Sequence, residues 1–151
     1  MSKILILVAT MGGTAEMVAE EVADRIEDVG EAARILRMEK ADSSVVAAAE
    51  RVIVCSSTYG AGDVPDNGQA FLDALKTERP DLSTLRYGVI ALGDTEYPQT
   101  FCGGGKTFDA LFTDLGATRL GERLEIDARS GVFPEEVAGV WVEHWLEMET
   151  A

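Results

Sequence analysis

The stretch that decides the fold is ILILVATMGGT, residues 4–14. Ile4–Ala9 is a continuous apolar run rich in β-branched side chains, which predicts a strand buried on both faces. A glycine-containing turn follows directly, and apolar residues take up helical spacing from Thr14 onward. Strand, tight turn and helix in this order are typical of the first βα unit of a parallel α/β sheet.

The same unit recurs along the rest of the chain. After a first helix over Thr14 to Val29, we expect a weak strand Ala32–Leu36, a short helix from Asp42 or Ser43 through Glu50, a strand Val52–Cys55, a helix from Pro65, a strand Val89–Leu92, a helix near Lys106–Leu115, a strand Arg119–Ile126, and a helix from Pro134 that carries Trp141 and Trp145. Five βα units with no linker or repeat predict one three-layer α/β domain over residues 1–151, with a five-stranded parallel sheet. We place the strands in the order 2-1-3-4-5, so that strand order reverses between the first and third strands.

Composition limits the classes of function. The chain has 151 residues, and 13 basic against 27 acidic side chains give a net charge of −14. That balance argues against nucleic acid or an anionic membrane surface as the main partner and suits a basic protein, although it also fits a role in solubility alone. The first apolar run is too short for a signal core or a membrane span.

Cysteine and histidine are scarce. Cys55 and Cys102 are too few for a disulfide framework, and the single His144 completes no metal-ligand set. Reduced thiols in a cytoplasmic protein are the simplest account of the two cysteines. Neither cysteine has the arginine six positions later that a phosphatase nucleophile requires. His144 is expected on a solvated helix face, without a role.

Three of the expected strands end in loops rich in glycine and hydroxyl side chains. They are residues 10–14, STYGAGD over residues 57–63 and GDTEY over residues 93–97. Because the carboxyl ends of parallel strands meet at one edge of a sheet, the three loops can converge on one ligand. Tyr59 and Tyr97 could enclose a planar ring. Each tyrosine also fits an exposed residue beside an ordinary turn.

The first of these loops also fits an anion site. The first helical turn offers backbone N–H groups, Gly12 and Gly13 allow close approach, and the hydroxyls of Thr10 and Thr14 can donate. Residues 4–24 contain no Lys or Arg, so a phosphate here would be held mainly by neutral donors unless a distant residue folds over it. A plain βα turn capped by threonine fits the same residues.

Two phosphate-binding motifs fail. Gly105-Lys106-Thr107 resembles the end of a P-loop, but Thr100 stands where the first glycine belongs. No GxGxxG follows the first strand, which argues against a dinucleotide fold.

Taken together, the loops resemble those of the flavodoxin family. STYGAGDVPDN, residues 57–67, resembles the segment that wraps the isoalloxazine ring of FMN. ALGDTEYPQTFCGGGKTFDALFTDLGATRLGE, residues 91–122, resembles the FMN domain of the sulfite reductase flavoprotein and the small MioC-type flavodoxins. ATMGGTAEMVAEE, residues 9–21, resembles the MioC-type phosphate loop. The resemblance covers nearly the whole chain and implies the flavodoxin-like three-layer sandwich.

The resemblance also implies a cofactor, FMN, and the residues that bind it. They are Thr10, Met11, Gly12, Gly13 and Thr14 at the phosphate; Thr58, Tyr59, Gly60 and Ala61 along one side of the ring; Gly93, Asp94, Tyr97, Phe101 and Cys102 along the other; and Asp127 as a loosely aligned acid. Three features depart from the family pattern or refine it. Ala9 and Met11 replace hydroxyl side chains that many flavodoxins have, and Pro98-Gln99-Thr100 lengthens the third loop. No long insertion interrupts the fifth strand, which indicates the short-chain type.

The function implied is that of an FMN-binding electron carrier without a substrate of its own. Its expected partners are basic redox proteins, with an NADPH-dependent flavoprotein reductase as donor. They would be steered by four acids near the ring, Asp63, Asp66, Asp94 and Glu96. Two alternatives stay open: an FMN enzyme that reduces quinones or another small acceptor, and an interaction module that keeps the fold without a flavin.

Overall fold

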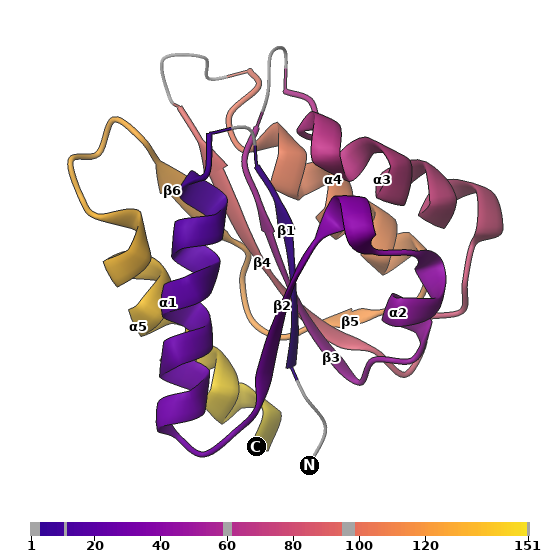
Figure 1. Ribbon diagram of the computed structural model, residues 1–151, viewed down its shortest axis with the longest axis horizontal. Helices are drawn as coiled ribbons and strands as arrows, with labels where there is room; N and C mark the ends of the chain where they lie inside the picture. The colour runs from indigo at the N-terminus through magenta and orange to yellow at the C-terminus, as the bar shows by residue number, and fades with distance from the viewer. Residues whose placement is uncertain (1–3, 11, 59–61, 95–98, 151) are drawn as a thin grey trace.

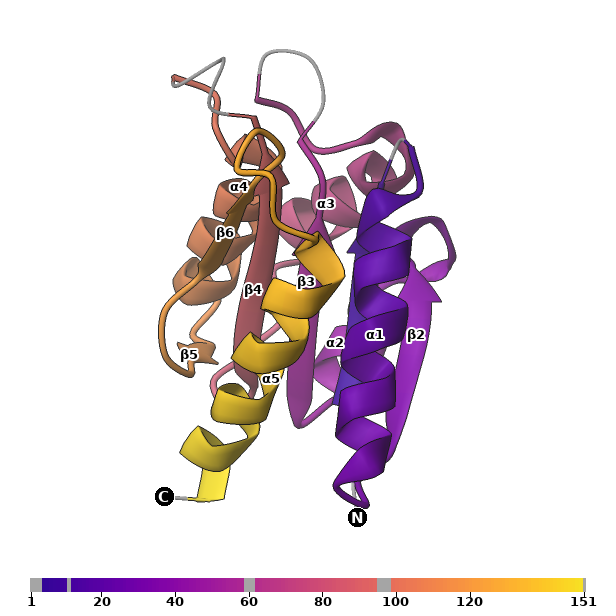
Figure 2. The same cartoon turned by 90° about the vertical axis from the view of Figure 1, so that its left-hand side faces the viewer.

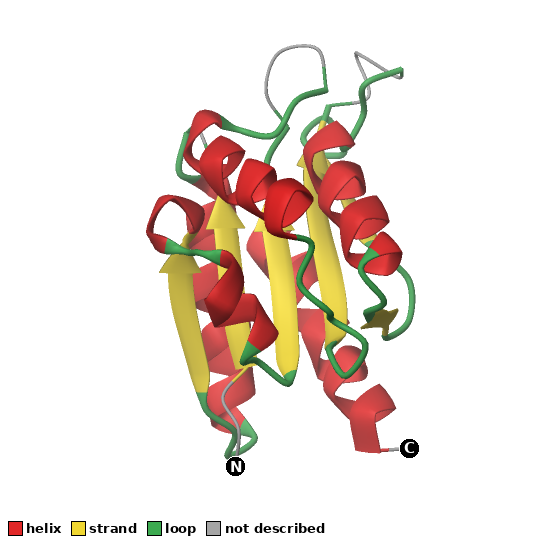
Figure 3. Ribbon diagram, turned by 90° about the vertical axis from the view of Figure 1, so that its right-hand side faces the viewer, coloured by secondary structure: helices red, strands yellow, loops and turns green. Residues whose placement is uncertain are grey.

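The computed structural model describes residues 4–10, 12–58, 62–94 and 99–150 (Figure 1). In chain order the elements are β1 (Ile4–Ala9), α1 (Thr14–Asp28), β2 (Ala33–Arg37), the 3₁₀ turn η1 (Met38–Lys40), α2 (Ser43–Ala47), β3 (Arg51–Ser56), α3 (Asp66–Glu78), β4 (Arg86–Gly93), α4 (Gly103–Asp114), β5 (Thr118–Arg119), β6 (Leu124–Asp127) and α5 (Pro134–Thr150). All pairings are parallel, in the order β2-β1-β3-β4-β5, with β6 also on β4 (Figure 3). The predicted α/β class and strand order are confirmed.

The central strand β1 is buried on both faces, as its sequence predicts. Successive side chains of a strand point to opposite faces of the sheet. Ile6 and Val8 lie in the core beneath α1 and α5, whereas Leu5 and Leu7 lie in the core beneath α3 and α4. Figure 2 shows α1 and α5 side by side over one face, and Figure 3 shows α2, α3 and α4 over the other. The sheet is therefore the middle of three layers.

Helix α5 joins the core through tryptophan. Trp145 is fully buried and its ring stacks on that of half-buried Trp141 at a centroid distance of 6.1 Å. Gly88 on β4 leaves room for both rings, since a Cβ there would lie 2.5 Å from Nε1 of Trp145. Val140 and His144 are exposed on the outer face of the helix, as expected for the histidine.

The expected fifth strand, Arg119–Ile126, is wrong as a single strand. It is divided into β5 and β6, and the two pieces pair with β4 in registers that differ by two residues. The extra residues form a short bulge that contains Gly121 at φ +71°. A left-handed backbone at this glycine lets the edge strand leave the sheet and return to it.

Buried Asp109 on α4 supports this interruption. Its carboxylate accepts a hydrogen bond from the Tyr87 hydroxyl at 2.6 Å and from Arg123 Nη1 at 2.6 Å, and it is also paired with Arg119. The two arginines flank the bulge, so one carboxylate holds both sides of it. Burial, followed by the bond to Asp109, raises the pKa of Tyr87 to about 12.

Two helices differ by about three residues from an expected end, and the other helix ends agree to within about one residue. Helix α4 begins at Gly103, ahead of the expected Lys106, because three glycines form its first turn against neighbouring backbone. Helix α2 ends at Ala47 and not at Glu50. Its expected cap is confirmed: Oδ1 of Asp42 accepts a hydrogen bond from the Val45 N–H at 3.2 Å.

Candidate functional site

A cavity of about 470 Å³ opens where the carboxyl ends of β3, β4 and β6 meet the beginning of α1. Pockets that bind small molecules and cofactors have volumes of this order. The cavity is lined by Thr14, Ser57, Thr58, Leu92, Gly93, Asp94, Thr100, Ile126, Asp127, Ala128, Val132 and Pro134. Of the predicted site residues, Thr14, Thr58, Gly93, Asp94 and Asp127 therefore share one cavity.

The first loop, residues 10–14, is stabilised by a hydrogen bond to the side chain of Thr10. This side chain is buried, and its Oγ1 accepts a hydrogen bond from the Gly13 N–H at 3.0 Å. Gly13 is at φ +90° and is the N-cap residue of α1, and no side-chain cap is found at that helix end among the described residues. Thr14 faces the cavity. Met11 lies outside the described residues.

Open space lies over the two glycines of this loop. A Cβ built on Gly12 or Gly13 would meet no described atom within 4 Å. The first turn of α1 thus presents backbone N–H groups and the positive end of a helix dipole next to unfilled space. This arrangement suits an anionic group.

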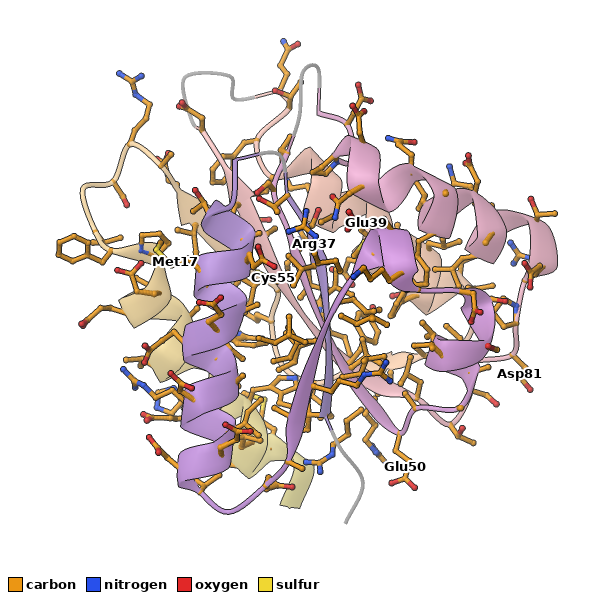
Figure 4. The ribbon with its side chains drawn as sticks, in the orientation of Figure 1. Met17, Arg37, Glu39, Glu50, Cys55 and Asp81 are labelled. Atoms are coloured by element: carbon orange, nitrogen blue, oxygen red, sulfur yellow. The ribbon has the colours of Figure 1, made fainter. Side chains whose placement is uncertain are left out.

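A cation does reach this end of α1, although none is near in sequence. Arg37, at the end of β2, pairs with Glu16 in the first turn of α1 at 2.9 Å. Its Nε also pairs with Glu39 at 2.9 Å, and Figure 4 shows Arg37 and Glu39 side by side. Two carboxylates therefore surround this guanidinium.

Asn67 at the start of α3 braces the same loop. Its Oδ1 accepts a hydrogen bond from the Thr10 N–H at 2.9 Å, and its Nδ2 donates to the carbonyl of Val8 at 3.2 Å and to Glu39 at 3.1 Å. The bonds from Asn67 and then Arg37 lower the pKa of Glu39, which keeps that carboxylate charged. Sequence reasoning missed Asn67, although it is the last residue of the quoted STYGAGDVPDN motif.

The second loop is fixed by Thr58. Its hydroxyl donates to the carbonyl of Leu92 at 2.8 Å and accepts from the Gly104 N–H at 3.2 Å. The Ser57 N–H donates to the carbonyl of Ala9 at 2.8 Å. Thr58 thus ties this loop to β4 and α4, and Ser57 ties it to β1. The predicted residues Tyr59, Gly60 and Ala61 lie outside the described residues.

In the third loop, Cys102 points away from the cavity. Its side chain is fully buried in the core, where Sγ donates to the carbonyl of Ala91 at 3.3 Å, and burial raises its pKa to about 12. Phe101 is half-buried against the same core, with Lys106 Nζ 5.8 Å from its ring centroid. Neither side chain is among those lining the cavity. Tyr97 and Glu96 lie outside the described residues.

Two carboxylates and a nearby arginine shape the far side of the cavity. Asp94 and Asp127 both line it. Arg129 follows β6, where its N–H donates to Asp127 Oδ1 at 3.0 Å and its Nε lies 4.0 Å from Asp94 Oδ1. Arg129 was missed in the sequence because nothing near it in the chain marks it as part of a site.

Neither a metal site nor a membrane span is found in the part of the chain that the structure describes. No three His, Cys, Asp or Glu side chains gather there as metal ligands. No helix among the described residues is long and apolar enough to cross a bilayer.

Comparison with known proteins places this geometry in a family. The flavodoxin family model matches residues 6–137. Flavodoxin YqcA from Pectobacterium carotovorum is 39% identical over 151 residues, covering 100% of this chain and 99% of that protein. Protein MioC from Escherichia coli K12 is 38% identical over 147 residues, with 95% of each chain covered. The solved structure of a cysteine-to-alanine mutant of a flavodoxin from Pseudomonas aeruginosa has a TM-score of 0.89 and 34% identity, and 99% of each chain is covered.

The resemblance to the FMN domain of the sulfite reductase flavoprotein is also confirmed. The alpha-component of the Vibrio cholerae enzyme is 38% identical over 126 residues, which span 83% of this chain and 20% of that protein. The chain belongs to the flavodoxin family, and it is an FMN-binding electron-transfer protein.

Proposed function

We propose that this flavodoxin carries electrons from an NADPH-dependent flavoprotein reductase to an acceptor protein, with FMN in the cavity at the carboxyl end of the sheet. When bound, FMN supplies the redox chemistry, and the chain binds, orients and tunes it. The observation that carries the proposal is the open space over Gly12 and Gly13 at the uncapped start of α1, directly beside the cavity. A phosphate needs that combination of room and N–H donors.

The remaining predicted site residues would act around the ring. Thr58, Gly93, Asp94 and Asp127, which line the cavity, would lie along it, and Thr10, which bonds to Gly13, would support the loop that holds the phosphate. Met11, Tyr59, Gly60, Ala61 and Tyr97 stay predictions from the family resemblance. Phe101 and Cys102 would act by shaping the third loop, because their side chains pack in the core. The two buried, free thiols of the chain suit a reducing compartment such as the cytoplasm.

Two carboxylates in the cavity favour the oxidised, less negative form of a bound flavin. One charge at about 10 Å with an effective dielectric constant near 40 contributes roughly 0.8 kcal/mol. At about 2.3 kcal/mol per 100 mV, this equals some tens of millivolts. Asp127→Asn should therefore raise the midpoint potential by that amount, which a redox titration of the holoprotein measures. An unchanged potential would show that this carboxylate does not act on the flavin.

Exposed acids near the cavity support a basic partner. Asp63 and Asp66 are exposed, and half-buried Asp94 lines the cavity. Charge complementarity raises association rates, and it is screened over a Debye length of about 8 Å at physiological ionic strength. Electron transfer should therefore slow as salt rises.

The experiment is stopped-flow reduction of the holoprotein by an NADPH-dependent flavoprotein reductase over a salt series. Asp63→Asn with Asp66→Asn should lower the association rate and flatten its salt dependence while FMN stays bound. The matched control is Asp28→Asn with Glu50→Gln, which removes two exposed acids at the opposite end of the sheet (Figure 4 labels Glu50). Equal effects of both pairs would place docking elsewhere. Rapid steady-state turnover of NAD(P)H with a quinone, without the reductase, would instead support a flavoenzyme.

A further inference from the structure

We infer that Asn67 is a positioning residue that sets the preference of the first loop for a phosphorylated flavin over one without phosphate. The inference rests on the proposed function. It concerns a side chain on α3 that reaches the loop after β1, 57 residues away in sequence.

The side-chain amide of Asn67 takes the place of a strand residue. Pairing between β1 and β2 ends at Val8 and Arg37. Beyond that point, the carbonyl of Val8 accepts from Nδ2 of Asn67 and the N–H of Thr10 donates to its Oδ1. In a parallel sheet, one residue of a neighbouring strand would use these same two groups of β1. Asn67 therefore continues the hydrogen-bond pattern of the sheet by one residue into the loop.

The loop is thereby held at two points. Asn67 fixes the backbone N–H of Thr10, and the hydroxyl of Thr10 accepts the N–H of Gly13. Gly13 in turn sets the direction in which α1 begins, with its backbone at φ +90°. A donor array arranged before the ligand arrives loses less conformational entropy on binding. The phosphate contacts should therefore depend on Asn67 even though its own polar atoms face the protein.

The orientation of the amide is also fixed. Glu39 can only accept a hydrogen bond and the Thr10 N–H can only donate one, so the nitrogen of Asn67 faces Glu39 and its oxygen faces Thr10. Arg37 holds Glu39 in place at 2.9 Å. An aspartate at position 67 would keep the acceptor for Thr10 but would face the Glu39 carboxylate.

The test is titration of the apoprotein with FMN and, separately, with riboflavin. Asn67→Ala should weaken FMN binding about tenfold, the effect of losing one to two hydrogen bonds, and should change riboflavin affinity less than about twofold. Asn67→Asp should lower FMN affinity at least as much. Glu39→Gln removes the ion pair with Arg37 and the charge that orients the amide, but it leaves Asn67 in place, so it should have a smaller effect.

The matched control is Gln69→Ala. Gln69 lies two residues further along α3, and its amide donates to the carbonyl of Val64 at 2.7 Å, away from the first loop. This variant should keep the FMN-to-riboflavin ratio of the wild type. Amide exchange measured by NMR on the apoproteins gives a second readout: the Thr10 N–H should lose protection in Asn67→Ala and retain it in Gln69→Ala.

The outcomes separate the two proposals. If the wild type binds FMN and riboflavin equally, the phosphate site of the proposed function is wrong. If the wild type prefers FMN and Asn67→Ala weakens both flavins alike, or neither, the positioning role is overturned while the phosphate site stands. Unchanged protection of the Thr10 N–H in Asn67→Ala would also overturn it.

Discussion

Two glycine-rich segments of this protein look alike in sequence, but one faces open space and the other is tightly packed. Gly12-Gly13 and Gly103-Gly104-Gly105 each come after a strand and at the start of a helix. Over the first pair, a Cβ would meet no described atom within 4 Å. At each of the three later glycines, a Cβ would come closer to a neighbouring segment than real Cβ atoms do: to the carbonyl of Gly62, the carbonyl of Ser57 and the Cβ of Ala91, respectively.

The difference shows what glycine supplies in each case. At Gly12 and Gly13 the missing side chain leaves room for a ligand. At residues 103–105 it lets the first turn of α4 pack directly on β4 and the second loop, where the Gly104 N–H bonds to Thr58. A glycine-rich helix start thus indicates a binding site only when the glycines face open space.

Gly104→Ala should have the largest effect on stability. Its Cβ would overlap the carbonyl of Ser57, a backbone atom that cannot move without displacing the second loop. Overpacking of this kind costs about 1–3 kcal/mol and more where backbone must shift, so we expect a loss of about 3 kcal/mol. Urea denaturation of the apoprotein measures it.

Gly12→Ala is the control for that variant, with the same chemical change in open space. It should leave the free energy of unfolding within about 0.5 kcal/mol of the wild type. Equal urea midpoints for the two variants would contradict the distinction between the crowded and the open segment.

Gly12→Ala should instead affect the ligand. If the phosphate of FMN uses the space over this loop, an added methyl group should raise the Kd for FMN about tenfold, or about 1.4 kcal/mol. Fluorescence titration of the apoprotein tests this. Wild-type affinity in Gly12→Ala would show that the phosphate lies elsewhere.

The sequence predicted what depends on local pattern. The unbroken apolar run of Ile4–Ala9 predicted a strand buried on both faces, and the parallel topology then brought Thr14, Thr58 and Asp127 to one cavity. The three-layer arrangement follows from the same pattern, because buried parallel strands need helices on both faces.

What the sequence did not predict depends on contacts between distant segments. Three glycines disfavour a helix by propensity, yet α4 begins on them because packing against Ser57 and Ala91 requires it. Asn67 acts on a loop 57 residues away. Cys102 is buried in the core and its backbone is left-handed at φ +58°, a conformation that no sequence rule assigns to cysteine.

Gly13→Ala should lower the stability less than Gly104→Ala does, and for a different physical reason. The site is open, so the cost is that of a side chain at φ +90°, about 1 kcal/mol. Gly30, at φ +87° beyond the other end of α1, is a matched position with equally open space. Gly30→Ala should lose the same stability in thermal denaturation, but only Gly13→Ala should also weaken FMN binding. A loss of FMN affinity in both variants would mean that the binding defect comes from a less stable α1 and not from the first loop.

The packing around residues 103–105 should also affect the titration and reactivity of the adjacent Cys102 thiol, and we expect this effect to be the smallest. Burial raises the pKa of Cys102 from its ordinary value near 9 to about 12, so the folded protein holds this proton more tightly than the unfolded chain. The contribution to stability is therefore complete below about pH 9 and is lost as pH rises toward 12. The pKa of buried Cys55 is also raised to about 12, and Cys55 and Tyr87 therefore act on stability in the same direction.

At about pH 8, neither thiol should react with a disulfide reagent until urea is added. Cys102→Ala should leave the Kd for FMN within about threefold of the wild type, because the side chain faces the core. Between about pH 8 and about pH 10.5, the urea midpoint of Cys102→Ala should fall less than that of the wild type. Rapid labelling of Cys102 in the native protein would show that this segment opens and that its glycines are not held by the packing described.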